Sequence, residues 1–400
     1  MNKKISLGSA VVMVSFAVLL TFMLTFVNAN QRYNRMLAGT ELSDKVILKL
    51  SELDKMAREL YIGEIDNRKI VDGIAEGYVN GLGDVYAEYM NAEKYAEHIM
   101  GSQGKMVGIG IEVKLSEKNG GALEVSAVMP DSPAMSGGML EGDYIYKVEG
   151  ELISSLGYEE SINRIKGEKG TSVNLTVLRK DEEIELSFTQ AEVQTQSVKY
   201  KMVTADIGYI RITQFNKETP TGFFEAVTEL ESLGAIKYIF DVRFNPGGDL
   251  EGVTKTLDLL LPEGPIIRYT HKNSGEETIM SDENELAVPM AVLINESTAS
   301  AAELFCAALK DYEKAVLIGT KTFGKGTMQG IYQLSDRVTA FKISYALYSP
   351  PFSECYDGIG VYPHIEVQLP ENLLKEKRFD SITAEEDTQL ETAIKALSDE

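Results

Sequence analysis

Short apolar runs alternate with helical patterns through the second half of the chain, and no other feature limits its fold as strongly. The runs expected to form strands are residues 207–212, 238–242, 290–294, 315–318 and 342–348. The patterns expected to form helices are residues 221–233, 253–261, 299–310 and 384–398. Strands and helices that alternate in this way are typical of an α/β domain.

The first half of the chain has a different pattern of apolar residues. Apolar side chains recur at helical spacing between residues 40 and 100, which predicts a helical N-terminal region. Between 101 and 191, β-type runs are separated by turns, with one helical segment at 157–165. The expected strands there are residues 107–111, 123–128, 143–148, 173–178 and 184–188. Because 400 residues exceed one ordinary domain, we expect a multidomain α/β (α+β) protein.

A basic and then apolar segment opens the sequence. Lys3 and Lys4 precede an uncharged stretch at 5–31, whose apolar centre of about 20 residues would span a bilayer as a helix. Basic residues in front of such a stretch favour a cytoplasmic N-terminus and a translocated remainder. We expect a single-pass protein of the cell membrane whose bulk lies outside the cytoplasm. The alternative is a signal peptide cleaved near Ala29, which would give a secreted protein.

Composition excludes several classes of function. The chain carries 39 basic and 61 acidic residues, a net charge of −22, and so repels nucleic acids. None of its three histidines has a second histidine at helical spacing, and Cys306 and Cys355 match no metal-ligand spacing. We therefore expect no nucleic-acid partner, no catalytic metal and no organic cofactor.

Three loops rich in small residues each follow one of the apolar runs of the second half. They are residues 244–248 (FNPGG), 295–303 (NESTASAAE) and 319–329 (GTKTFGKGTMQ). Loops that follow strands are where α/β folds place binding and catalytic groups. We therefore expect the chemistry of this chain in these loops.

Ser300 in the second loop is the candidate nucleophile. It stands between alanines at the start of a predicted helix, so a substrate backbone can approach its hydroxyl closely. The unpaired N–H groups at a helix N-terminus would stabilise an oxyanion that develops there. A serine in this position can equally do no more than cap the helix.

Lys325 in the third loop is the candidate base. A lysine can accept a proton only when its amine is neutral, which requires burial or a nearby positive potential. The helix N-terminus at Ser300 would supply both, and the amide of Gln329, four residues on, would orient the amine. A solvated loop lysine is the ordinary alternative.

Two other interpretations of these loops are weaker. Residues 319–325 approach the phosphate-binding pattern GxxxxGK[ST], but Gly326 stands where that pattern needs a hydroxyl, and the residues that follow look strand-like. A Ser-His-Asp triad would need a histidine in a comparable loop, and the sequence has none there. A serine hydrolase with this sequence would therefore use lysine as its base.

Together the three loops resemble those of the carboxyl-terminal processing peptidase family, also called tail-specific proteases. The family's nucleophile, base and following glutamine match Ser300, Lys325 and Gln329. The resemblance also implies that the N–H groups of Gly247 and Ala301 form the oxyanion hole.

The resemblance extends beyond the loops. Residues 107–111 and 137–143 resemble the family's PDZ domain, residues 81–86 its N-terminal segment and residues 357–363 its C-terminal segment. The expected organisation is a membrane anchor or signal segment at 1–30, a helical region at 31–100, a PDZ domain at 101–191, a crotonase/Clp-protease-like α/β catalytic domain at 192–372 and a helical tail at 373–400.

The function that this resemblance implies is cleavage of unfolded or C-terminally tagged proteins by a serine endopeptidase with a Ser-Lys dyad. A PDZ domain adds a peptide to its sheet as a strand and captures the free carboxylate on backbone N–H groups. The residues expected to do so are Gly108, Ile109, Gly110 and Ile111. Lys166 stands where some relatives carry an arginine that couples this domain to the active site.

The expected partners are proteins or peptides with free hydrophobic C-termini, and the resemblance also suggests a homodimer. Two alternatives stay open. One is a non-catalytic PDZ-type scaffold that binds peptides at the cell surface. The other is a peptidase in which the PDZ domain serves only as an inhibitory gate.

Overall fold

The computed structural model describes residues 7–37, 43–116, 121–272, 275–370, 373, 379 and 382–398. The chain divides into two compact units, Met1–Gly73 and Ile74–Glu400.

The first unit is helical. It contains α1 (Leu7–Leu37) and α2 (Ser43–Leu60), and α3 (Asn67–Asn80) begins in it. The helices α2 and α3 lie in the region where the apolar spacing predicts helices. Among the residues that the structure describes, no helix combines the length and the apolar character needed to cross a membrane.

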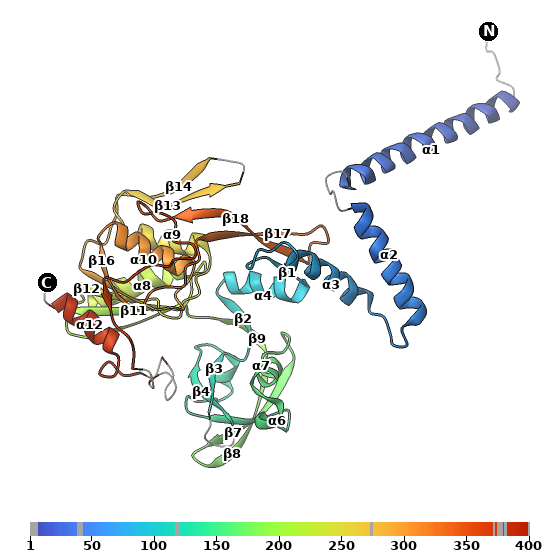
Figure 1. The fold of residues 1–400 in the computed structure, drawn as a ribbon. Helices are drawn as coiled ribbons and strands as arrows, with labels where there is room; N and C mark the ends of the chain where they lie inside the picture. The colour runs from blue at the N-terminus through green and yellow to red at the C-terminus, as the bar shows by residue number, and fades with distance from the viewer. Residues whose placement is uncertain are drawn as a thin grey trace, which may run out of the picture. The chain divides into compact units, whose positions relative to one another are not determined.

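A six-stranded sheet forms the centre of the second unit (Figure 1). Its strands, in spatial order, are β10 (Val198–Met202), β11 (Ile207–Ile212), β12 (Lys237–Asp241), β15 (Met290–Ile294), β16 (Ala315–Gly319) and β19 (Ile365–Glu366). All neighbours pair in parallel except β10 and β11. The predicted alternation of strands and helices is therefore confirmed.

Helices cover both faces of this sheet because successive side chains of a strand point to opposite faces. The helices are α8 (Thr219–Ser232), α9 (Leu250–Asp258), α10 (Ala301–Asp311) and α12 (Thr388–Ser398). Phe240 of β12 is buried in one cluster with apolar side chains of α8, α9 and α10. Its neighbour Ile239 is buried in another cluster with Leu390 and Leu397 of α12.

A second sheet contains strands that are far apart in the sequence. Its order is β1 (Glu88–Met90), β18 (Ala340–Ser349), β13 (Gly264–His271) and β14 (Glu276–Ser281), with β17 (Thr327–Gln333) also paired to β18. The residues after Lys325 form the strand β17, as the sequence predicts. A phosphate-binding loop would instead continue into a helix. The strand β1 lies in the region expected to be helical, just before α4 (Ala92–Ser102).

A separate antiparallel sheet lies between residues 111 and 189. Its order is β3 (Ile111–Leu115), β4 (Leu123–Val128), β5 (Tyr144–Val148), β7 (Ser172–Arg179) and β8 (Glu182–Thr189), with β6 (Glu151–Leu152) paired to β5. The helices of this segment are α5 (Pro133–Ser136), α6 (Ile153–Leu156) and α7 (Tyr158–Lys166). One apolar cluster joins the helices to the sheet, including Ile109 and Ile165.

The single strand expected at 107–111 is wrong. The structure has β2 (Lys105–Gly108), which pairs with β9 (Ala191–Gln194), and a new strand that begins at Ile111. Gly110 separates them with a φ of 80°. A Cβ at Gly110 would lie 2.3 Å from the Cβ of Ser132, so the bend depends on glycine.

Candidate active site

Three neighbouring parallel strands bring the three predicted loops to one edge of the central sheet. The loops at 244–248, 295–300 and 320–326 follow β12, β15 and β16, which pair side by side and run in the same direction. The carboxyl ends of parallel strands therefore meet at this edge, as in other α/β folds.

Buried polar side chains join the first loop to the second. The Oδ1 of Asn295 accepts the N–H of Phe244 at 2.9 Å, and the hydroxyl of Thr298 donates to the carbonyl of Val242 at 2.9 Å. The N–H of Ala299 donates to the carbonyl of Asn245 at 3.0 Å. These bonds cross between the loops and hold the FNPGG segment beside Ser300.

The carboxylate of Glu303 joins the second loop to the third. Its Oε2 accepts the N–H groups of Ser300 at 2.9 Å and of Lys325 at 2.8 Å. Its Oε1 accepts the hydroxyl of Thr322 at 2.5 Å and the N–H of Gly324 at 2.6 Å. The side chain is fully buried, and four hydrogen bonds satisfy the carboxylate in that environment.

Ser300 has a strained backbone, with a φ of 56° at the residue that precedes α10. A non-glycine residue held in this region costs on the order of 1–3 kcal/mol and persists only when its surroundings fix it. The bond to Glu303 and the bonds that the Ser300 carbonyl accepts from Glu303 and Leu304 supply that restraint. Such strain is common where a side chain is presented for catalysis.

Gly247 and Gly248 lie against this serine. A Cβ at Gly247 would lie 2.9 Å from both the N of Ala301 and the Cβ of Ser300, so only glycine allows this approach. The Gly247 N–H donates to the Oδ1 of Asn245 at 2.8 Å. The N–H groups of Gly248 and Ala301, in contrast, have no acceptor among the described residues.

Lys325 is half-buried, and its amine lies over an aromatic ring that the sequence did not point to. The Nζ is 4.4 Å from the centre of the Tyr86 ring. Burial, with the charge of Lys342, lowers the pKa of Lys325, and this outweighs the opposite effect of Asp84 and Glu303. The environment therefore favours the neutral amine that a general base needs.

In the described residues no hydrogen bond joins the amide of Gln329 to the amine of Lys325. Its Nε2 donates to the carbonyl and hydroxyl of Thr327, both at 3.0 Å, and to the hydroxyl of Ser344 at 3.2 Å. The pairing of β17 with β18 shifts register between Met328 and Gln329. The Gln329 amide therefore forms its hydrogen bonds with β17 and β18. Its role in orienting the amine stays a prediction.

Ser300, Lys325 and Gln329 line one cavity of about 330 Å³. Its other lining residues are His98, Pro246, Gly248, Asp249, Leu250, Ile267, Ala301, Leu304, Thr327, Met328, Ile331, Lys342 and Tyr348. The candidate nucleophile, the candidate base and the N–H groups of Gly248 and Ala301 therefore lie at a single cavity with both polar and apolar walls.

Asp249 and His98 give part of this cavity a polar wall. The Oδ2 of Asp249 is buried and has no hydrogen-bond partner among the described residues. Burial raises the pKa of Asp249 and lowers that of His98. A donor group of a substrate that reached this wall would find an unused acceptor.

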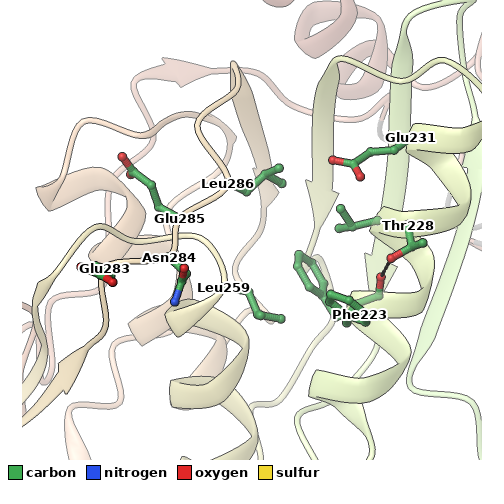
Figure 2. Close-up of a pocket in the computed structure, with 10 residues that line it drawn as sticks. Phe223, Thr228, Glu231, Leu259, Glu283, Asn284, Glu285 and Leu286 are labelled. Carbon is green, nitrogen blue, oxygen red and sulfur yellow. Dashed lines mark hydrogen bonds between the residues drawn. The ribbon is translucent and has the colours of Figure 1, made fainter.

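A larger cavity of about 450 Å³ lies elsewhere in the same unit (Figure 2). Phe223, Thr228 and Glu231 of α8 face Leu259 and Leu286 across it. The described residues that line it include no serine, lysine or histidine, and the Thr228 hydroxyl donates to a carbonyl of its own helix. This cavity is larger than the one at Ser300, but its lining does not combine a nucleophile with a base.

The residues expected to bind a peptide C-terminus lie in the segment with the antiparallel sheet. Gly108 ends β2 and Ile111 begins β3, which is an edge strand of its sheet. Ile109 shares a buried cluster with Ile165, so this loop lies beside the last turn of α7, which ends at Lys166. The free edge of β3 is the kind of surface to which a peptide strand can add.

Sequence reasoning missed several residues of the site. It assigned no chemistry to residues 81–86, although Tyr86 covers the amine of Lys325. It also passed over Tyr348, whose hydroxyl donates to the Lys325 carbonyl at 2.9 Å. The family resemblance of residues 81–86 is the one feature of the sequence that points to this segment.

Comparisons with known proteins agree with this geometry. Residues 206–367 match the model of peptidase family S41, and residues 124–179 match a PDZ domain. A carboxy-terminal-processing protease of Bartonella bacilliformis is 32% identical over 337 residues, which are 82% of this chain and 76% of the relative. The carboxy-terminal processing protease CtpA of Bacillus subtilis is 33% identical over 326 residues, 81% of this chain and 69% of that protein.

A solved structure has the same fold. A Bacteroides fragilis protein described as an S41 protease aligns with a TM-score of 0.59 at 17% identity, over 81% of this chain and 90% of that chain. At this identity the likeness is one of fold.

Proposed function

Because the chain belongs to the carboxy-terminal processing proteases of peptidase family S41, we propose that Ser300 is its nucleophile and Lys325 its general base. The protein is thus a serine-type processing peptidase that carries a PDZ domain. One observation carries the assignment of residues: Ser300 and Lys325 line the same cavity, and a single oxygen of Glu303 accepts both of their N–H groups. This arrangement favours catalysis over a scaffold that only binds peptides.

The proposed reaction proceeds through an acyl-enzyme. Neutral Lys325 takes the proton of the Ser300 hydroxyl as its Oγ bonds to the scissile carbonyl carbon. When the tetrahedral intermediate collapses, the C–N bond breaks and protonated Lys325 gives its proton to the leaving amine. A water molecule then attacks the ester in the same way and releases the carboxylate product.

The oxyanion needs two donors beside Ser300. The N–H of Ala301, the first residue of α10, is one. The other comes from the Gly247–Gly248 pair. Gly248 has the unused N–H, whereas Gly247 can donate only after its bond to Asn245 is broken. Loss of one preorganised donor of this kind typically lowers kcat by about a hundredfold or more.

The test is cleavage of an unfolded polypeptide such as casein by protein that lacks residues 1–30. Ser300→Ala and Lys325→Ala should each reduce kcat by about 10⁴-fold or more, as in other enzymes that lose a nucleophile or base. Lys321→Ala is the matched control, because Lys321 belongs to the same loop, is exposed and lies over the Tyr362 ring. It should cleave like the parent.

Equal cleavage by all four proteins would reject the assignment. If even the parent fails to cleave, short peptides with apolar C-termini should be added. Such peptides would bind the PDZ domain and release it if it blocks the active site. Failure after that addition would favour the peptide-binding scaffold.

The PDZ domain is proposed to receive the hydrophobic C-terminus of a substrate along the free edge of β3. The carboxylate would bind the N–H groups of the loop from Gly108 to Ile111, beside Lys166. Docking there can either deliver the substrate or release an inhibitory gate. The two roles predict opposite effects of deleting residues 101–191: loss of cleavage if the domain delivers, and unregulated cleavage if it inhibits.

Location and assembly are proposals that rest on the sequence. Lys3, Lys4 and the uncharged stretch at 5–31 support export of the remaining chain across a membrane, with the stretch either kept as an anchor or cleaved. Cell fractionation with and without residues 1–30 tests this directly. The proposed homodimer is tested by measuring the mass of the protein in solution.

A further inference from the structure

The turn at residues 84–86, which precedes the PDZ domain, reaches the catalytic lysine. The Tyr86 ring lies 4.4 Å from the Nζ of Lys325, and both side chains are half-buried. We propose that Tyr86 and Asp84 position the amine of Lys325, so that this turn belongs to the active site. The inference rests on the proposed function, because it assigns the turn to the same base.

Asp84 fixes the turn to the sheet that follows Lys325. Its Oδ1 accepts the N–H of Tyr86 at 2.9 Å and the hydroxyl of Ser344 at 3.1 Å. Its Oδ2 accepts the N–H of Ser344 at 2.8 Å. One carboxylate therefore holds the backbone of Tyr86 and a residue of β18 at once.

The same Ser344 hydroxyl continues the connection toward Lys325. It donates to Asp84 and accepts the Nε2 of Gln329, which also donates to the carbonyl and hydroxyl of Thr327. Just after Tyr86, β1 pairs with β18 from Glu88 to Met90. The turn is thus bonded directly to β18 and, through Ser344, connected to β17, the strand that follows the lysine loop.

The ring acts on the amine in two opposite ways. Its face attracts the protonated amine, and its bulk keeps water away from the same amine. Burial leads the causes that lower the pKa of Lys325, and the ring is part of what buries the amine. The charged groups that face the amine are Lys342, which lowers this pKa, and Asp84 and Glu303, which raise it.

The Tyr86 hydroxyl remains protonated at neutral pH. Burial, followed by the charges of Asp357, Glu303 and Asp84, raises its pKa above 10.0. The ring is therefore neutral at neutral pH, and its effect there comes from position and shape. The ring restricts the conformations of the amine, and a base held in one position transfers protons faster than a mobile one.

These effects predict opposite shifts for two variants in the pH profile of kcat/KM for fluorescently labelled casein. Tyr86→Leu opens the amine to water, so the ionisation midpoint should rise and kcat should fall by about tenfold to a hundredfold, with KM little changed. Asp84→Asn removes a negative charge, so the midpoint should fall. Tyr86→Phe keeps the ring and should stay within about threefold of the parent, and Tyr200→Leu on the exposed face of β10 is the matched control.

Ser300→Ala and Lys325→Ala belong in the same assay. If they still cleave, the proposed function fails. If they are inactive while folded Tyr86→Leu keeps the kcat and midpoint of the parent, only the role of the turn is overturned. Should Tyr86→Leu fail to fold, the Asp84→Asn profile decides, and an unchanged midpoint there overturns the proposal.

Discussion

The backbone N–H groups of Ser300 and Lys325 donate to the same carboxylate oxygen, Oε2 of Glu303, at 2.9 and 2.8 Å. One atom therefore links the backbones of the proposed nucleophile and the proposed base. Because Glu303 lies in the first turn of α10, the helix itself fixes that atom. The two loops cannot move apart without breaking a charge-assisted hydrogen bond in a dry environment.

Glu303→Gln should reduce both activity and stability. A glutamine has one acceptor oxygen, so its NH₂ group would face N–H donors that now bond to the carboxylate. Each donor left without an acceptor costs about 1–3 kcal/mol of the free energy of unfolding. Chemical denaturation and casein cleavage measure the two effects. Glu296→Gln is the matched control, because Glu296 is exposed on the same loop, and equal losses in both variants would contradict the role of Glu303.

Activity should rise with pH through a single ionisation. The pKa of Lys325 is lowered from its ordinary value of 10.5, chiefly by burial, so the midpoint of kcat/KM should lie below that value. The rate should level off above the midpoint, where the amine is fully neutral. Lys325→Arg should be inactive at every pH because a guanidinium stays protonated. A pH-independent rate between about 6 and 9 would count against Lys325 as the base.

Lys325→Met should be more stable than the parent at neutral pH, although it is inactive. A folded pKa below the unfolded one means that the unfolded chain binds more protons between the two values. Stability from this group therefore rises with pH through that window, and below it the folded protein bears the cost of a buried charge. The difference in Tm between Lys325→Met and the parent should shrink as the pH approaches 10.5. The control Lys321→Met, at an exposed lysine, should have the Tm of the parent at every pH. A lower Tm for Lys325→Met would contradict the argument.

Asp387→Asn should destabilise the attachment of the C-terminal helix. Asp387 and Asp241 both pair with the buried guanidinium of Arg243, at 2.8 and 2.6 Å. Breaking a buried ion pair costs on the order of 3 kcal/mol, measurable by denaturation. Glu391→Gln, which breaks an exposed pair with Lys395, should cost less than about 1 kcal/mol. Similar losses in both variants would mean that the buried pair adds little.

Peptide binding should depend on a free C-terminal carboxylate. Amidation of a short apolar peptide should weaken its affinity by about tenfold or more, since bonds to a charged group are lost. Gly110→Ala should weaken it too, because the new Cβ would overlap Ser132. Gly170→Ala is the control, with a similar positive φ but open space around it. Calorimetry that detects no effect of amidation would exclude carboxylate capture.

The four inner strands of the central sheet, β11, β12, β15 and β16, could be predicted because they are largely apolar and buried. The expected bounds of β11 and β15 agree with the structure to the residue. Strands buried on both faces have this continuous pattern, and the loops that follow them hold Ser300 and Lys325. The family model then matches residues 206–367. The individual roles of Ser300, Lys325, Gln329, Gly247 and Ala301 stay predictions.

Contacts between distant segments could not be predicted in this way. The strand β1 has only the residues Glu88–Met90, too few for a period, and its position is set by pairing with β18. The contact of Tyr86 with Lys325 joins residues from opposite halves of the chain. Likewise, the N–H of Gly247 donates to Asn245 because of the local turn, which composition does not reveal.

The shared Glu303 carboxylate also determines how the site loses its structure. Its hydrogen bonds involve the amides of Ser300, Gly324 and Lys325, so opening any one of them to solvent removes a hydrogen bond from a buried carboxylate. In hydrogen exchange the three amides would therefore behave as one cooperative unit, with a common free energy of opening. Partial unfolding would then leave Ser300 and Lys325 either both in place or both displaced, and a half-assembled site would not accumulate.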